Sequence, residues 1–411
     1  MGESHFGRNL RRELVLLLVV VGALGITSGI FETTLNNFLS DTFHISAQQR
    51  GELEFPRELP GFLVAVLGGV LFFLSETRLG FLAASCVALG LAGLAAVGDR
   101  SYGAMIVFLL IWSMGAHMLM PVMSTVTLSL APRGQRAGRM GQVGSVGMMT
   151  TILGSGLVWI GLQYAHLSYR AMFITAGAFA LVAASALSRL HPLPARPGQR
   201  PKLVLKRRYS LYYLLCVFSG ARKQIFITFG PWVLIKVFGE PAPTIAKLWI
   251  VACVIGIFFQ PRLGRLIDRV GERAILMADA VVIVLICLGY GFAQRLPLLH
   301  PVHLVYACYV LDQVVFACGM ARATYLDKIA ESEADVHASL SVGVSIDHAV
   351  SMSIPILGGL LWIKAGYSAV FVAAACVAVG NLCAASFLSA PRPGARIAEA
   401  EREAESAVMP D

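Results

Sequence analysis

Several ionisable side chains of this sequence lie inside long apolar segments. A charged group at the centre of a membrane helix costs about 3 kcal/mol on insertion scales, so such groups usually bind a solute, carry a proton or pair with one another. The acidic residue Glu32 lies in one such segment, with Thr33 and Asn36 on the same helical face. We therefore expect a polar stripe here that faces a site rather than lipid.

Two adjacent cations, Arg222 and Lys223, lie in another apolar segment, followed by Gln224. Their side chains are about 100° apart around a helix, so one of them points more fully inward. When the Ser-Gly dipeptides of the two segments are aligned, Glu32 falls opposite Lys223 and Thr33 opposite Gln224. We expect Glu32 and Lys223, or Arg222, to form a charge pair that a solute or proton breaks. The alternative is a fixed structural pair.

Four more ionisable residues are candidates for the same site. His117 titrates near neutral pH and is suited to relay protons, although a core histidine bonded to a backbone carbonyl is an equal alternative. Asp312 is a candidate for the cavity of the protein. The pair Asp347 and His348 is either a proton relay or a contact to the preceding segment. No metal or cofactor is expected.

The composition places the chain in a membrane. Hydrophobic residues make up 57% of it and charged residues 14%, against about 45–50% and about 25% in soluble domains. The net charge of +9 comes from basic residues in short loops, which is typical of membrane proteins, so we expect no nucleic-acid partner. The eight cysteines lie inside apolar runs without a C-x-x-C motif, which indicates small core residues rather than disulfides or metal ligands.

Twelve segments are apolar enough to span a bilayer, which takes about 20 residues. They cover residues 14–38, 52–74, 79–97, 102–130, 138–162, 169–189, 209–236, 244–262, 274–293, 302–326, 338–363 and 367–389.

The polar stretch 190–208 divides these segments into two groups. We expect an N-terminal six-helix bundle over 1–189, a basic linker over 190–208, a C-terminal six-helix bundle over 209–389 and a solvated tail over 390–411. Weak internal repeats in the fifth and eleventh segments, and in the sixth and twelfth, favour two related halves. Basic residues concentrate on the face that holds the N-terminus and linker, so both termini and the linker should be cytoplasmic.

Charged residues near the start of the second segment, Glu54, Arg57 and Glu58, lie close to two prolines on the opposite face. We interpret them as an extracellular gate or as surface groups. Asp279, in the ninth segment, is interpreted as structural.

A charged stretch separates the eighth and ninth segments and reads Gly-Arg-Leu-Ile-Asp-Arg-Val-Gly-Glu-Arg. We expect a loop, because the two glycines allow a tight turn and the arginines need water or lipid headgroups. The pattern Gly-x-Leu-x-Asp-Arg-x-Gly-x-Arg resembles the signature loop of the major facilitator superfamily. Its residues here are Gly264, Asp268, Arg269, Gly271 and Arg273.

The resemblance implies an all-α integral membrane fold of twelve transmembrane helices in two pseudo-symmetric six-helix bundles. In that family the loop joins the second and third helices of a half, which here are the eighth and ninth. Helices 1, 4, 7 and 10 line the cavity in the family, which places Glu32, His117, Arg222 and Asp312 on cavity helices.

The resemblance also implies a cytoplasmic gating latch. Asp268 should approach the start of the fifth helix, where the partial positive charge of a helix N-terminus favours a carboxylate, with Arg136 and Arg139 as partners. The copy of the loop in the first half lacks the Asp-Arg core but keeps Arg78. We expect Arg78 to pair with the acidic start of the eleventh helix, at 331–335.

These observations predict a secondary active transporter that moves a small polar organic solute by alternating access, coupled to protons. An anion or zwitterion is favoured because two adjacent cations lie in a cavity helix. One alternative is a proton-driven efflux pump for amphipathic or drug-like compounds, although the Gly-x-x-x-Gly-Pro motif of such antiporters is missing. The second alternative is a transport-dead receptor or scaffold on the same fold.

An enzyme is not expected, because the loops hold no cluster of catalytic residues. No phosphate-binding loop of the Gly-x-x-x-x-Gly-Lys-Ser/Thr type occurs, which excludes ATP as the expected energy source. The expected partners are a small solute, protons and the lipid bilayer. We expect a monomeric multi-pass protein of the cell membrane.

Overall fold

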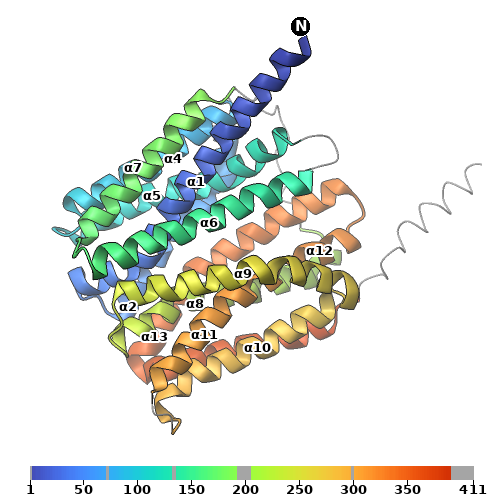
Figure 1. Ribbon diagram of the computed structural model, residues 1–411. Helices are drawn as coiled ribbons and strands as arrows, with labels where there is room; N and C mark the ends of the chain where they lie inside the picture. The colour runs from blue at the N-terminus through green and yellow to red at the C-terminus, as the bar shows by residue number, and fades with distance from the viewer. Residues whose placement is uncertain (1, 71–73, 132–135, 192–204, 298–299, 390–411) are drawn as a thin grey trace, which may run out of the picture.

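The computed structural model describes residues 2–70, 74–131, 136–191, 205–297 and 300–389. Within these residues every regular element is helical and none is a strand. Figure 1 shows long helices that run side by side, with the blue-to-green helices on one side and the yellow-to-red helices on the other. The all-α membrane fold is therefore confirmed in its class.

The N-terminal group of helices comprises α1 (Gly2–Phe43), α2 (Ala47–Glu52), α3 (Glu54–Val70), α4 (Glu76–Val97), α5 (Tyr102–Ser129), α6 (Arg136–Gln163) and α7 (Tyr169–Arg189).

The C-terminal group comprises η1 (Arg207–Tyr209), α8 (Ser210–Lys236), α9 (Ala242–Val270), α10 (Glu272–Phe292), η2 (Ala293–Arg295), α11 (Pro301–Val315), η3 (Phe316–Gly319), α12 (Met320–Ile329) and α13 (Glu333–Ser386). Gly366, with φ of 82°, divides α13 into two helices.

Ten helices of the described residues are long and apolar enough to cross a membrane. The two predicted spans outside this set are 52–74, which corresponds to α3, and 209–236, which corresponds to α8. Since α3 ends next to residues outside the description and α8 contains several cations, the count of twelve stays a prediction. Most of the predicted linker and the whole tail 390–411 lie outside the described residues.

The signature stretch is not the loop that we expected. Helix α9 continues through it to Val270, and the chain turns at Gly271, whose φ of 83° is favourable for glycine. Leu263 and Ile267 are one helical turn apart and both are buried, so they hold this end of α9 against the protein. Arg265 lies on the exposed side of the same helix, and water is therefore available to arginines without a loop.

The predicted segment 302–326 is also interrupted. It is built from α11 and α12 with the short 3₁₀ turn η3 between them. This change of helical pitch lies in the part of the chain that carries Asp312 and Arg322.

Within each group of helices a glycine allows two helices to pack closely, and the packed pairs correspond between the two groups. A side chain at Gly29 in α1 would bring Cβ to 2.2 Å from the carbonyl oxygen of Thr151 in α6. A side chain at Gly358 in α13 would bring Cβ to 2.5 Å from the ring of Phe229 in α8. Small residues allow such approach between membrane helices. The first and fifth predicted helices thus pack as the seventh and eleventh do.

The two groups of helices meet at one end of the bundle, which we call the distal face because it is opposite the start of α1. There Asn37 donates a hydrogen bond to the carbonyl of Glu240 at 3.0 Å. The Nζ atom of Lys247 lies 5.9 Å from the ring centre of Trp159. At the other end, the N-terminal face, a Cβ added to Gly141 or Gly264 would meet no described heavy atom within 4 Å. The described residues therefore form a conformation that is closed at the distal face.

We predict that Gly29→Leu destabilises the protein, because the new side chain collides with the backbone of α6. Overpacking of this kind costs about 1–3 kcal/mol of the free energy of unfolding. Thermal unfolding of the purified protein in detergent measures the effect. Gly156→Leu is the matched control, since a Cβ at Gly156 meets nothing within 4 Å. Equal melting temperatures for the two variants would contradict the packing.

Candidate functional site

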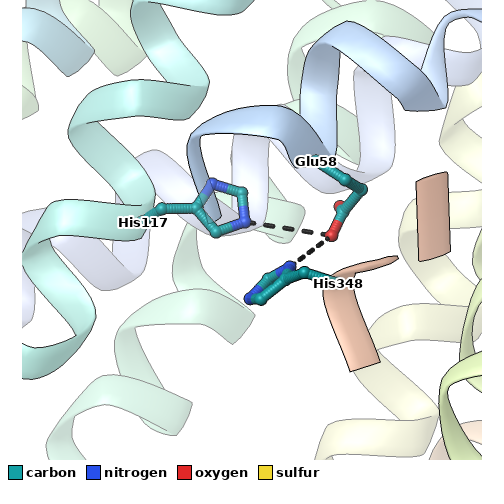
Figure 2. A group of neighbouring side chains, drawn as sticks. All are labelled: Glu58, His117 and His348. Atoms are coloured by element: carbon teal, nitrogen blue, oxygen red, sulfur yellow. Dashed lines mark hydrogen bonds and ion pairs between the residues drawn. The ribbon is translucent and has the colours of Figure 1, made fainter. Parts of the chain in front are cut away.

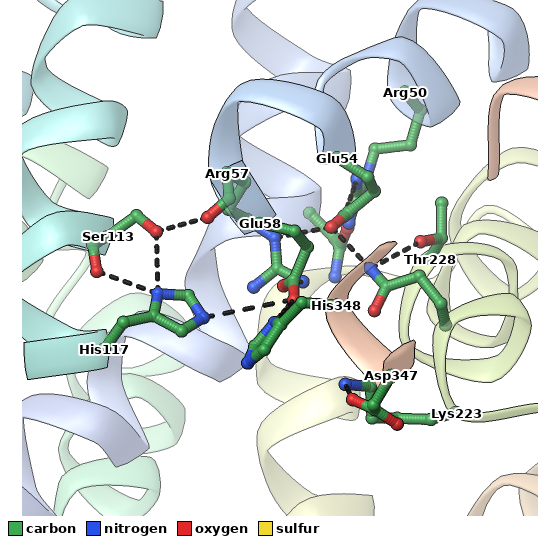
Figure 3. A network of polar contacts seen from close by, with 12 residues as sticks. Arg50, Glu54, Arg57, Glu58, Ser113, His117, Lys223, Thr228, Asp347 and His348 are labelled. Carbon is green, nitrogen blue, oxygen red and sulfur yellow. Dashed lines mark hydrogen bonds and ion pairs between the residues drawn. The ribbon is translucent and has the colours of Figure 1, made fainter. Parts of the chain in front are cut away.

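A network of buried charges joins the two groups of helices near the distal face (Figure 3). At its centre is Glu54, whose side chain is fully buried. Its carboxylate accepts hydrogen bonds from Arg50, from Arg57 Nε at 2.6 Å and from Gln224 of α8. Arg50 also donates to the amide oxygen of Asn36 at 2.8 Å. A carboxylate of the N-terminal group thus binds a side chain of the C-terminal group.

Local sequence explains why these charges share one face. Ser46 caps α2 through a capping box with Gln49, which fixes the start of the helix. Arg50, Glu54 and Arg57 then follow at spacings of four and three residues, so their side chains lie on one side. Helices α2 and α3 both pack against α13.

The surface interpretation of this region was wrong. Glu54, Arg57 and Glu58 are 0%, 8% and 4% exposed, because α2 and α3 are covered by α13. The sequence interpretation also did not consider Arg50. The signal that was present is the alternation of opposite charges at helical spacing, which allows buried charges to neutralise one another.

Three side chains meet where α3, α5 and α13 converge (Figure 2). Glu58 Oε2 is 3.0 Å from His348 Nδ1 and 3.9 Å from His117 Nε2. The two imidazole rings are 5.1 Å apart at their centres. His117 is bonded to the backbone carbonyl of Ser113, as the alternative interpretation proposed, and at the same time it faces Glu58. The structure thus brings both predicted histidines together across the boundary between the two groups.

The expected pair between Glu32 and Lys223 is not formed. Lys223 Nζ instead forms an ion pair with Asp347 of α13. Arg222 Nη2 lies 2.9 Å from Asp312 Oδ1 in α11, and the same nitrogen donates to the carbonyl of Asp312. Arg222 and Lys223 are therefore both neutralised within their own group of helices.

Glu32 faces a different set of cations from the one we expected. The cations that act on its carboxylate are Arg57 and Arg50, on α3 and α2. Its neighbour Thr33 donates to the carbonyl of Gly29 at 2.6 Å, so this hydroxyl is satisfied by its own helix. Sequence alignment of two repeats equates positions, but the rotation of each helix decides which neighbour a side chain meets.

A cavity of about 330 Å³ lies inside the C-terminal group of helices. Arg222 and Arg322 line it, together with Asp279 of α10 and the ring of Phe316. Arg222 Nε and Asp279 Oδ1 are buried and have no hydrogen-bond partner in the described residues. The guanidinium of Arg222 also stacks on Phe316, 5.4 Å from the ring centre. Two residues of the cavity wall thus each contain a buried polar atom that no described residue binds.

The expected contacts of the signature stretch are not formed in this conformation. Asp268, Arg269 and Arg273 are exposed, and none makes an ion pair with a described residue. Near the end of this stretch, the buried carboxylate of Glu272 lies 2.7 Å from Lys328 Nζ, and this ion pair connects the start of α10 to α12. The cause is the separation of the two groups of helices at the N-terminal face, which keeps α9 away from the start of α6.

Of the two arginines expected to complete the latch, only Arg139 has a described side chain. Arg139 bonds to Gln142 of its own helix at 3.0 Å. The side chain of Arg136 lies outside the described residues.

The acidic start of α13 is bound by two residues at the end of the predicted linker, Lys206 and Arg208, instead of by Arg78. Lys206 Nζ lies 2.7 Å from Asp335, and Arg208 Nη1 lies 2.5 Å from Glu331. Arg78 is exposed, and only its backbone N–H is held, by the cap of α4. The hydrogen bond from Lys206 lowers the pKa of Asp335 below its ordinary value. The expected pairing of Arg78 was wrong because closer cations occupy the carboxylates.

A family model described as Major Facilitator Superfamily matches residues 15–344. The chain belongs to the major facilitator superfamily. It is therefore a multi-pass membrane transporter and not an enzyme, as the sequence predicted. No match is found among curated protein sequences.

Solved structures of this superfamily share the fold. The nucleoside transporter NupG is 15% identical, with a TM-score of 0.70, and the match covers 91% of this chain and 97% of that one. A D-xylose-proton symporter is 14% identical with a TM-score of 0.68 and coverage of 92% and 98%. The human organic anion transporter TETRAN is 16% identical with a TM-score of 0.61 and coverage of 92% and 99%. At such identities the likeness shows the fold alone.

We predict that Glu54→Ala destabilises the protein strongly, because it leaves Arg50 and Arg57 buried without their shared carboxylate. Breaking a buried ion pair on one side costs about 3–5 kcal/mol of the free energy of unfolding. Thermal unfolding in detergent checks this. Glu52→Ala, at an exposed site two residues earlier, should stay within about 0.5 kcal/mol of the wild type. A Glu54 variant as stable as the Glu52 variant would show that the network is dispensable.

Proposed function

We propose that the protein is a proton-coupled secondary transporter of a small polar organic anion or zwitterion, located in the cell membrane with both termini in the cytoplasm. Membership of the superfamily supports transport. The structural neighbours include transporters of nucleosides, organic anions and a sugar, and one of them is a proton symporter. They favour a small polar solute but do not choose among these classes.

The observation that carries the proposal is the double role of Arg222. One nitrogen of its guanidinium holds Asp312, while Nε is unpartnered and the residue lines the cavity. An anionic group in the cavity competes with Asp312 for the same cation. Protonation of Asp312 removes this competition, so binding of a proton and binding of an anion support each other.

The surroundings of Asp312 are consistent with this coupling. Its side chain is 4% exposed, and the charged groups nearest to it are Arg222 on α8 and Asp279 on α10. Further titratable groups near it are Cys287 and Tyr290 of α10 and Cys308 and Tyr309 of α11. A buried carboxylate with one cation partner releases that partner when a proton neutralises the carboxylate or when an anion binds the cation in its place.

Alternating access would explain why the two groups of helices are in contact at the distal face and apart at the N-terminal face. The conformation described here is closed at the distal face, and in this proposal the solute reaches the site from the N-terminal face. The opposite conformation requires the ends of α6 and α9 to approach, which brings the exposed Asp268 toward the N-terminus of α6. We infer that the latch of the signature stretch forms only in that second conformation.

An efflux pump for amphipathic compounds is the second candidate function. The observation in its favour is the apolar part of the cavity wall, where Phe218, Leu276 and Ile283 accompany the polar groups. An amphipathic cation would place its charge near Asp279, whereas an anion would place its charge near Arg222. The two candidates therefore differ in the sign of the charge that the solute carries.

Counterflow in proteoliposomes tests the function directly. We expect exchange of one class in a panel of nucleosides, sugars, carboxylates, amino acids and cationic dyes, and accumulation when an inward proton gradient is applied. Exchange of cationic dyes alone would favour the efflux pump. Absence of exchange for every class, with intact folded protein, would favour a receptor or scaffold.

We predict that Asp312→Asn uncouples transport from protons. The amide mimics the protonated carboxyl, so solute exchange should persist, while accumulation driven by a proton gradient should be lost. The ratio of gradient-driven uptake to counterflow measures this. Asp99→Asn, at an exposed site, is the control and should keep the wild-type ratio. A normal ratio in the Asp312 variant would refute the assignment of the coupling group.

We predict that Asp268→Asn shifts the protein toward the conformation open at the N-terminal face, because the latch of the other conformation loses its charge. Electron-resonance distances between nitroxide labels at Ser145 and Arg262, on α6 and α9, report the two populations. The fraction of molecules with the shorter distance between the labels should decrease in the Asp268 variant. Asp99→Asn again serves as control, and an unchanged distribution in the Asp268 variant would count against the latch.

A further inference from the structure

We propose that Glu58, His117 and His348 form a binding site for a divalent transition-metal ion, with Zn²⁺ as the best match. Their three donor atoms, one carboxylate oxygen and two imidazole nitrogens, all lie within 4.8 Å of one another. Figure 2 shows the side chains pointing at a common centre from three helices. Imidazole and carboxylate are ligands that zinc accepts, and three protein ligands leave a fourth position for water.

The distances fit such an ion after a small movement. Zinc bonds of about 2.0–2.2 Å place the donor atoms of a tetrahedral site about 3.3 Å apart. Glu58 Oε2 is already 3.0 Å from His348 Nδ1 and 3.9 Å from His117 Nε2. The largest adjustment is a closer approach of the two rings.

The surrounding hydrogen bonds leave His117 Nε2 and Glu58 Oε2 available to an ion, whereas His348 Nδ1 donates to Glu58 Oε2 and has to lose that proton when an ion binds. His117 Nδ1 donates to the carbonyl of Ser113 at 2.9 Å, so the lone pair lies on Nε2, which faces Glu58. A ring N–H held by a backbone carbonyl is the usual support of a metal-binding histidine. Arg57 Nη2 holds the other carboxylate oxygen, Glu58 Oε1, at 2.9 Å and leaves Oε2 for the ion.

A glycine provides the space in which the rings can meet. A Cβ at Gly61 would lie 2.5 Å from His117 Cδ2 and 2.5 Å from His348 Cε1. Since real Cβ atoms do not approach so closely, any other residue at Gly61 would separate the two histidines. The glycine lies three residues after Glu58, on the same side of α3.

The charges nearby also favour a cation. Within α1, α2 and α3, the carboxylates Glu32, Glu54 and Glu58 lie near two cations, Arg50 and Arg57, and Lys223 of α8 also acts on Glu58. Lys223 and Asp347 neutralise each other beside this cluster. With the histidines neutral, these carboxylates outnumber the arginines by one, so the local charge attracts a cation rather than an anion.

Metal binding would have a conformational consequence. Glu58 and His117 belong to the N-terminal group of helices, whereas His348 belongs to α13. An ion bound to all three ties the groups together near the distal face. Such an ion favours the conformation that is closed at the distal face, because the three ligands lie together in it.

Titration of the full-length purified protein in detergent with Zn²⁺ tests the proposal without measuring transport. We expect one ion per chain that raises the melting temperature, and a four-coordinate absorption spectrum when Co²⁺ replaces it. His117→Gln and His348→Ala should each weaken Zn²⁺ binding by more than about 100-fold, beyond the 10–100-fold loss caused by removing a supporting group.

The matched control is His303→Ala. His300 and His303 are exposed neighbours with ring centres 5.3 Å apart, and they offer the alternative of adventitious surface binding. Binding kept in His303→Ala and lost in the other two variants supports the site. Binding lost only in His303→Ala, or wild-type affinity in both His117→Gln and His348→Ala, overturns it. An octahedral Co²⁺ spectrum of the wild type also overturns it and does not depend on how any variant folds.

Discussion

The neutralisation of charge out of contact with water is the constraint on which this structure depends. Glu54 is fully buried and binds Arg50, Arg57 and Gln224, so its carboxylate connects α2 and α3 with α8. A buried charge without a partner costs several kcal/mol. Arg50 and Arg57 neutralise Glu54 within α2 and α3, and Gln224 adds a hydrogen bond between the two groups that a displacement of α8 would break.

The same constraint explains why the second set of charges is suited to change its partners. Asp312 has one cation partner, Arg222, which lines a cavity and whose buried Nε has no hydrogen-bond partner among the described residues. Glu54, by contrast, has three donors that lose their acceptor if it moves. The protein thus combines a rigid polar junction between its two groups of helices with a less saturated ion pair inside one of them. We regard the second as the place where solute and proton meet.

The sequence predicted the helical segments well, but it did not predict which charged side chains form ion pairs. The apolar segments predicted the spans because burial in lipid depends on composition over about 20 residues, which needs no knowledge of neighbours. The pair of Glu32 with Lys223 was wrong because α8 turns Lys223 toward Asp347, and this rotation follows from packing such as that of Gly358 on Phe229. The signature stretch was helical because the burial of Leu263 and Ile267 outweighs the preference of its arginines for a loop.

By itself, therefore, the sequence determined the membrane class, the order of the helices, the family resemblance and the presence of costly charges inside apolar segments. These properties follow from the local chemistry of consecutive residues. Only the tertiary structure decided which charges meet. The convergence of Glu58 and His117 with His348, which lies far away in the sequence, depends on how α3, α5 and α13 pack, and no local pattern encodes the rotation of one helix against another.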